Sequence, residues 1–308
     1  MRRPKDYLLL YLKGVGIGAA DVIPGVSGGT IAFITGVYEE LIFSIRAIDR
    51  TALRLFFSFQ LAEFWKKING NFLFTIMAGV ITSIMLLFKV ISYFLKNNSI
   101  SISSFFFGVI FVSTPLILRE VKQWNMVTVL TFLVGIALAY TLTVISPTEI
   151  PTNLLIVFIC GFLTASATML PGISAIFVLL LLGKYEYMMT SILNLNIAVI
   201  SIFVLGCFSG LVGFSRALSL MLNLYRFPML TLLAGIMIGS LNKLWPWKIV
   251  TGFRLDLAGI QTPAFGRSVW PGQFDRDPQL FHAILFLALG IFVVVAIEKT
   301  AGYIKSKS

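Results

Sequence analysis

Long apolar runs separated by short polar stretches dominate the pattern of this 308-residue chain. Six of the runs have the roughly 17–25 residues that a helix needs to cross the hydrocarbon core of a bilayer. They predict membrane-spanning helices over 71–95, 101–118, 127–145, 196–222, 228–245 and 281–298. The pattern therefore predicts an all-α integral membrane protein.

Two further apolar segments are each interrupted by a Pro-Gly pair. They are residues 8–43, broken at Pro24 and Gly25, and residues 153–190, broken at Pro171 and Gly172. A helical arm of about 16 residues spans only about 24 Å, less than a hydrocarbon core of about 30 Å. We therefore predict two re-entrant hairpins; two ordinary helices joined by a turn outside the membrane remain the alternative.

The two hairpins are copies of each other. The stretch GAADVIPGVSGGTIAFITGVYE, from Gly18, and the stretch ASATMLPGISAIFVLLLLGKYE, from Ala165, agree at seven positions at an offset of 147 residues. The repeat continues into the helices, where glycines align in pairs: Gly79 with Gly206, Gly108 with Gly235, and Gly135 with Gly290. Each half, 1–145 and 146–308, thus holds one hairpin and three helices. An odd number of crossings inverts the second half, so we predict an inverted repeat with converging hairpin tips, as in many transporters.

Each half also carries a polar insertion. In the first half, residues 45–68 mix Phe56, Phe57 and Trp65 with basic residues, which predicts an amphipathic segment on an anionic membrane surface. In the second half, residues 246–280 are predicted to form a long loop outside the membrane.

Composition supports the membrane assignment, because 58% of residues are hydrophobic, 12% are charged and the mean hydropathy is +0.94. The net charge of +11 is concentrated in loops. The distribution of Lys and Arg predicts that both termini are cytoplasmic. Anionic lipids account for much of this charge, so we expect no nucleic-acid partner. The sequence does not predict the oligomeric state.

The first hairpin tip has the composition of an anion site. Ser27, Gly28, Gly29 and Thr30 open the return arm, and Ser174 repeats one hydroxyl in the second hairpin. Glycines let backbone N–H groups approach a ligand, and helix N-termini favour negative charge. Small residues also serve close helix packing in membranes, so both interpretations remain open.

Two cations lie within apolar runs at equivalent positions of the repeat, Lys89 and Arg216. Ionisable groups within membrane segments are costly and usually functional, so we predict that both contact an anionic substrate. The alternative is that both side chains extend to the membrane surface from a helix end.

Three acids lie in or beside the hairpins: Asp21, Glu39 and Glu186. An unpaired buried carboxylate has a raised pKa and can carry a proton, so these are candidates for proton coupling. Asp21 has Thr168 in its place in the second hairpin. The alternatives are a helix cap or ion pair for Asp21 and exposure to water for the two glutamates.

An enzyme is not expected. Intramembrane phosphatase chemistry uses a nucleophile with a base or a cluster of metal ligands. The single histidine, His282, lies far from both hairpins in the sequence, and Cys160 and Cys207 lie in separate apolar runs. We predict no metal site. From these residues alone, carriers of a lipid phosphate and of a small soluble anion are equally well supported.

The motifs resemble one known family. The GAADVIPGVSGGT stretch, Tyr38-Glu39, the second Pro-Gly-Ile-Ser and the segment from Gly239 to Trp247 are similar to the polyprenyl-phosphate transporters of bacterial inner membranes. The resemblance covers essentially the whole chain. It implies a duplicated helical fold without a cofactor. It also implies translocation of undecaprenyl phosphate from the outer to the inner leaflet for recycling in cell-wall synthesis, with transport of a small soluble anion as the alternative.

Overall fold

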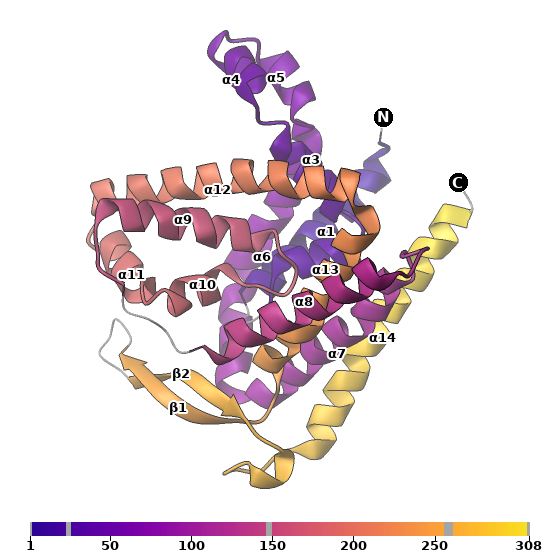
Figure 1. Ribbon diagram of the computed structural model, residues 1–308, viewed down its shortest axis with the longest axis vertical. Coiled ribbons are helices and arrows are strands. Elements are labelled where there is room, and N and C mark those ends of the chain that lie inside the picture. Colours follow the sequence, from indigo (N-terminus) through magenta and orange to yellow (C-terminus); the bar gives the residue numbers. More distant parts are fainter. Residues whose placement is uncertain (1, 23–25, 146–149, 256–260, 307–308) are drawn as a thin grey trace.

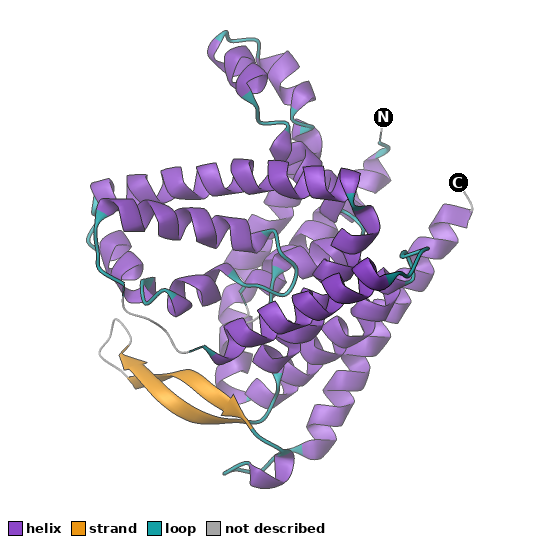
Figure 2. Cartoon of the chain, in the orientation of Figure 1, coloured by secondary structure: helices purple, strands orange, loops and turns teal. Residues whose placement is uncertain are grey.

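The structure is a computed structural model that describes residues 2–22, 26–145, 150–255 and 261–306. It is a bundle of helices with one small β-hairpin at its lower left (Figures 1 and 2). The predicted all-α membrane fold is confirmed. Five described helices are long and apolar enough to cross a membrane, and two bent helix pairs raise the number of candidate spans to seven.

Two sets of elements follow each other along the chain. The first is α1 (Pro4–Asp21), α2 (Gly28–Ile34), α3 (Tyr38–Arg46), α4 (Arg50–Phe57), α5 (Leu61–Lys67), α6 (Gly70–Asn97), α7 (Ser99–Leu118) and α8 (Met126–Val144). The second is α9 (Leu154–Thr168), α10 (Ala175–Leu181), α11 (Tyr185–Leu193), α12 (Ile197–Leu224), α13 (Arg226–Leu244), β1 (Lys248–Leu255), β2 (Gln261–Ser268), the 3-10 turn η1 (Pro271–Gln273) and α14 (Leu280–Ser306). The six predicted membrane helices correspond to α6, α7, α8, α12, α13 and α14.

The long helices pack in pairs through glycine contacts that occur twice. A Cβ on Gly79 of α6 would lie 2.3 Å from the Tyr11 carbonyl oxygen of α1, and one on Gly206 of α12 would lie 2.2 Å from that of Phe158 in α9. Each pair of backbones therefore touches with no room for a side chain, as is common between membrane helices. Tyr11 and Phe158 are equivalent positions of the sequence repeat, so the packing is duplicated with the sequence.

The remaining helices exchange partners between the halves. Gly108 of α7 faces the Leu287 carbonyl of α14, and Gly235 of α13 faces the Phe132 carbonyl of α8. These contacts are again equivalent in the repeat, but each joins a helix of one half to a helix of the other. The inversion of the halves across the membrane stays a prediction.

The return arms of both hairpins differ from the expected single helix. Each arm breaks a second time, at Gly36 between α2 and α3 and at Gly183 between α10 and α11. The glycines have φ angles of +72° and +64°, which side chains rarely adopt, and the helices turn by 116° and 109°. The repeated Gly-x-Tyr-Glu of the sequence marks this second turn, which the hydropathy pattern alone does not reveal.

Both hairpins come back to the end at which they start. The guanidinium of Arg2, before α1, pairs with Glu40 of α3. In the second hairpin the ammonium of Lys184, before α11, donates to the hydroxyl of Thr152, before α9, at 2.7 Å. This path is that of a re-entrant hairpin; its re-entry into the membrane stays a prediction.

The two ends of the molecule carry different structures. Ion pairs of Arg226 with Glu39 (3.0 Å) and of Arg119 with Glu298 (3.6 Å) define one end, the terminal face. The first residues of α1 and the last described turn of α14 also lie there, at the upper right of Figure 1. The β-hairpin lies at the opposite end.

Both polar insertions have more structure than expected. Residues 246–280, predicted as a loop, contain the antiparallel strands β1 and β2. The indole N–H of Trp245 donates to the Val269 carbonyl at 2.7 Å and that of Trp247 to the Pro278 carbonyl at 2.8 Å, which ties this segment to the end of α13. Residues 45–68 contain two short helices, α4 and α5, which project from the bundle (Figure 1), and the amphipathic character of this segment at a membrane surface stays a prediction.

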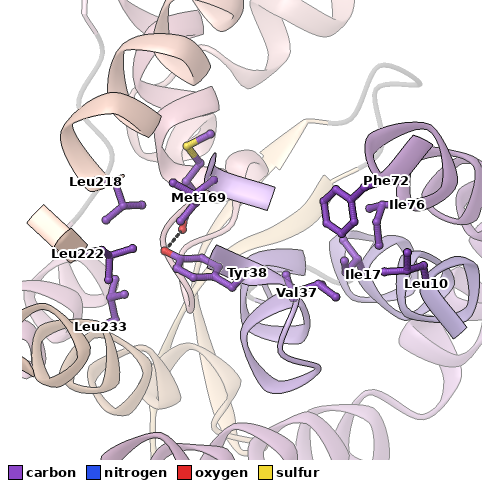
Figure 3. Packing of buried hydrophobic residues seen from close by; sticks show 12 residues of the cluster. Leu10, Ile17, Val37, Tyr38, Phe72, Ile76, Met169, Leu218, Leu222 and Leu233 are labelled. Atoms are coloured by element: carbon purple, nitrogen blue, oxygen red, sulfur yellow. Dashed lines mark hydrogen bonds between the residues drawn. The ribbon is translucent and has the colours of Figure 1, made fainter. Parts of the chain in front are cut away.

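One apolar core joins the halves around the first hairpin. Figure 3 shows Tyr38 between Val37 of its own hairpin and Met169 of the second, with Leu218 of α12 and Leu233 of α13 close by. All five residues are buried. The turn between α2 and α3 is thus fixed by contacts with the second half of the chain.

We expect Gly206→Ala to destabilise the protein by about 1–3 kcal/mol, because the new methyl group must push α12 away from the α9 backbone. Gly213→Ala, in the same helix, is the matched control, since a Cβ there would meet only two Phe162 ring atoms, at 3.7 and 4.0 Å. Thermal unfolding in detergent measures both. Equal unfolding temperatures for the two variants would contradict the role of the close backbone contact.

Candidate functional site

The two hairpin tips touch in the interior of the bundle. The backbone N–H of Gly172 donates to the Thr30 hydroxyl at 2.8 Å, and the Ser27 hydroxyl donates to the Leu170 carbonyl at 3.3 Å. Beside them the Tyr38 hydroxyl donates to the Met169 carbonyl at 2.6 Å, as Figure 3 shows. Ser27, Thr30 and Tyr38 are almost completely buried. These bonds satisfy backbone groups that the broken helices leave without helical partners.

Two glycines allow this approach. A Cβ on Gly29 would lie 2.8 Å from the Thr168 carbonyl oxygen, and one on Gly172 would lie 2.6 Å from the Ser240 hydroxyl. Gly172 also has a φ of +91°. Pro171, next to it, is fully buried. Pro24 and Gly25, the predicted break of the first hairpin, lie outside the described residues.

A carboxylate of the chain itself occupies the predicted anion cradle of the first tip. Asp21 Oδ1 accepts a hydrogen bond of 2.7 Å from the Gly28 backbone N–H, at the start of α2. The Ser27 hydroxyl accepts a second one from Gly29 at 3.2 Å. Asp21 thus acts as the helix-end cap that was the alternative to proton coupling, and any second anion here would meet its charge.

The second tip has the opposite charge. Thr168 replaces Asp21 there, and the Ser174 side chain makes no capping bond to α10. The ammonium of Lys243, from α13, lies 4.4 Å from the centre of the Phe177 ring. At the equivalent position of the first half the repeat has Leu116. The two tips are therefore chemically unequal: a carboxylate serves one and a cation the other.

Lys243 lies near the end of the predicted helix 228–245, where the sequence pattern gave it no role at the site. In the structure it lies in the last turn of α13 and lines a narrow slit beside the second tip, together with Gly172, Ile173, Ser174, Phe177, Ser240 and three residues of α8. The signal that pointed to it is its place in the Gly239 to Trp247 motif. Hydropathy alone does not predict that Lys243 lies beside the second tip, because a lysine at a helix end normally faces water.

Of the two predicted intramembrane cations, Arg216 does not join the tips. Arg216 is exposed, and its guanidinium donates to the Ile48 carbonyl between α3 and α4 at 3.1 Å. Nearby, Arg46 donates to the Ser219 hydroxyl of α12 at 2.6 Å. Lys89 lies in α6, and its side chain is outside the described part of the structure.

The two glutamates lie away from the tips as well. Glu39 pairs with Arg226 at the terminal face, and Glu186 is exposed at the start of α11. Among the residues that the structure describes, no group of His, Cys, Asp or Glu could hold a metal ion. The chemistry that the described tips offer is therefore hydrogen bonding and attraction of an anion by Lys243.

Comparison with known proteins gives a consistent match. The sequence profile of the family described as "Undecaprenyl phosphate translocase-like" matches residues 17–262. A protein of Vibrio cholerae serotype O1 named "Polyprenyl-phosphate transporter" is 40% identical over 300 residues, which cover 96% of this chain and 97% of the relative. A protein of Staphylococcus aureus with the same name is 31% identical over 258 residues, covering 76% of this chain and 85% of the relative. No solved structure matches the chain.

The matched region contains both hairpin tips, the helix pairs α9–α12 and α8–α13, and the motif that carries Lys243. The V. cholerae relative extends the match over nearly the whole length of both chains. Together with its apolar helices, this makes the protein a multi-pass membrane protein, and the chain belongs to the undecaprenyl phosphate translocase-like family.

Proposed function

We propose that this protein moves undecaprenyl phosphate across the bacterial inner membrane, from the outer to the inner leaflet, and so returns the carrier lipid for cell-wall synthesis. The match to a named polyprenyl-phosphate transporter over 96% of the chain carries this proposal. The structure adds a physical reason. A polyprenyl phosphate has an anionic head, which needs a polar path, and a long apolar tail, which stays in the bilayer.

The hairpin tips supply a barrier of the right kind. Non-helical backbone at membrane depth is tolerated only where it is buried in protein or lines a water-filled cavity. Here the Thr30–Gly172 and Ser27–Leu170 bonds close the space between the tips. When the tips separate, the hydroxyls of Ser27 and Thr30 become free to bind the phosphate beside that of Ser174. The N–H groups of Gly28 and Gly29 join them once Asp21 and the Ser27 hydroxyl release them. The glycine turns at Gly36 and Gly183 are the hinges of this movement.

The predicted orientation places the terminal face in the cytoplasm and the β-hairpin outside. Loop cations favour this orientation. The projecting α4–α5 pair then lies against the anionic inner leaflet, since it exposes Phe56, Phe57 and Trp65 beside basic residues. We propose that Arg216, which joins α12 to the Ile48 carbonyl just before this pair, lies near the inner leaflet and receives the phosphate head there. Lys89 has the equivalent role near the outer leaflet.

Proton coupling rests on the three acids of the hairpins. Asp21 is the strongest of them, because its carboxylate holds the first tip together through Gly28. Protonation would weaken that bond and loosen the tip. Glu39 and Glu186 follow the second turns of their hairpins, at Gly36 and Gly183, and Glu39 already has a cationic partner in Arg226.

We expect the purified protein to deplete undecaprenyl phosphate from the outer leaflet of liposomes, scored with a headgroup-specific probe, and Ser174→Ala to slow the rate about tenfold. The loss of one hydrogen bond to a charged group has about this effect. Ser191→Ala is the matched control, because its hydroxyl bonds only the Tyr187 carbonyl of its own helix. If folded wild-type protein moved no lipid, with or without a proton gradient, lipid transport would be wrong and a soluble anion would be tested.

We expect Thr30→Val to lower the free energy of unfolding by about 1–3 kcal/mol, because it leaves the buried N–H of Gly172 without an acceptor. Thr30→Ser keeps the hydroxyl and should recover most of the loss. Thermal unfolding in detergent measures both variants. A Thr30→Val protein as stable as wild type would show that the tip contact contributes little to the fold.

A further inference from the structure

A second polar cavity lies beneath the β-hairpin, outside the contact between the tips. It has a volume of about 420 Å³, within the range of small-ligand sites. The end of α8, the end of α13 and both strands form its walls. The lining residues are Tyr140, Thr143, Val144, Ile145, Asn242, Lys243, Lys248, Thr251, Gly266, Arg267 and Ser268.

Its charge is one-sided. Three of the described lining residues are cations, Lys243, Lys248 and Arg267, and none of those lining residues is Asp or Glu. Hydroxyl and amide groups from Thr143, Asn242 and Ser268 complete the polar surface. Three converging cations repel each other unless an anion lies between them.

The polar wall is held in place by its own hydrogen bonds. The Asn242 amide donates to the Thr143 hydroxyl at 2.6 Å, and its oxygen accepts from Ser268 at 2.9 Å. Asn242 thereby joins α13 to α8 and to β2. The Lys248 ammonium donates to the Lys243 carbonyl at 2.6 Å, at the C-terminus of α13. The Lys248 ammonium and the polar wall around Asn242 are therefore held in place, whereas Arg267 is exposed at the edge of the cavity.

Lys248 has an environment that is unfavourable for its positive charge. Its burial, and next the charge of Lys243, lower the pKa of Lys248 to about 7. A lysine is usually charged up to about pH 10.4. Burial in the cavity thus disfavours the charged form of Lys248, and a bound anion would favour it.

The cavity connects to the hairpin tips and to the lipid. Thr143 and Lys243 line both this cavity and the slit beside Gly172 and Ser174. On the α8 side, Tyr140, Val144 and Ile145 are about half exposed and apolar, as expected of a helix surface that faces lipid. A phosphate in the cavity would have an apolar exit for an attached chain on one side and the second tip on the other.

We propose that this cavity is a binding site for a phosphate group, held by Lys243, Lys248 and Arg267, from which the group passes Lys243 to the second hairpin tip. A lipid headgroup and free phosphate share this chemistry. The apolar α8 wall favours the lipid, and that preference rests on the transport function proposed above. The phosphate site itself rests on the cavity.

Isothermal titration calorimetry on the full chain in detergent tests this proposal, with a short-chain polyprenyl phosphate, the matching uncharged prenol and inorganic phosphate as ligands. We expect the polyprenyl phosphate to bind, and Lys248→Met and Arg267→Gln each to weaken binding about tenfold. Arg276→Gln is the matched control, because Arg276 is exposed in the same segment and does not line the cavity. The prenol should bind at least tenfold more weakly than the phosphate.

The outcomes separate the two proposals. If wild-type protein binds inorganic phosphate and both cavity variants weaken that binding, the cavity proposal is supported. If the same protein moves no lipid in liposomes, only the lipid function is overturned. Wild-type lipid transport with phosphate binding unchanged in Lys248→Met and Arg267→Gln would overturn the cavity alone. Equal weakening by Arg276→Gln would also overturn it, because a general effect of surface charge would then explain the result.

The pH dependence gives an independent check through Lys248→Arg, which stays charged. Above pH 7 the wild-type cavity must take up a proton to bind an anion, whereas the variant need not, so wild-type affinity should fall relative to the variant by up to about tenfold per pH unit. The other ionisable groups lining the cavity, Lys243 of α13, Arg267 of β2 and Tyr140 of α8, are common to both proteins, as is the ionisation of the ligand. Parallel pH profiles would show that Lys248 does not contact the anion.

Discussion

Buried backbone that is not helical must find hydrogen-bond partners, and this requirement organises the structure. Each hairpin breaks its helix in the interior, where N–H and C=O groups lose their helical partners. The other hairpin supplies the replacements: Thr30 accepts from Gly172, and Ser27 donates to Leu170. Each tip therefore depends on the other for these hydrogen bonds. The close helix pairs α7 with α14 and α8 with α13 join the two halves that carry these tips.

The duplicated framework carries unequal chemistry. The glycine contacts between helices recur at equivalent positions, yet Asp21 has Thr168 as its counterpart and Lys243 has Leu116. A symmetric pair of tips would present the same charge twice. Here one tip is capped by a carboxylate and the other lies beside a cation, so an anion approaching the middle of the molecule meets attraction from one side only. Under the proposed function, this inequality favours binding of the phosphate head at the second hairpin.

The β-hairpin turns the end of α13 into a cavity. Without β1 and β2, Lys243 would be a lysine at the end of a helix, facing water. With the two strands in place, Lys243 lines a cavity of about 420 Å³ together with Lys248 and Arg267. The tryptophans that follow Lys243 in the sequence fix the strands to the bundle, which explains the chemical role of a motif that hydropathy shows only as a helix end and a turn.

The sequence by itself determined the membrane class, the six long helices, the two Pro-Gly breaks and the duplication, because each depends on local composition or on direct comparison of segments. It also identified Ser27, Thr30 and Gly172 as members of the tips. Only the tertiary structure decided what these residues contact, since Thr30 and Gly172 are 142 residues apart and no local pattern joins them. The second turns at Gly36 and Gly183, the strands within 246–280 and the convergence of Lys243, Lys248 and Arg267 likewise depend on packing between distant segments. Hydropathy reports where a residue prefers to lie, but charge convergence depends on which segments meet.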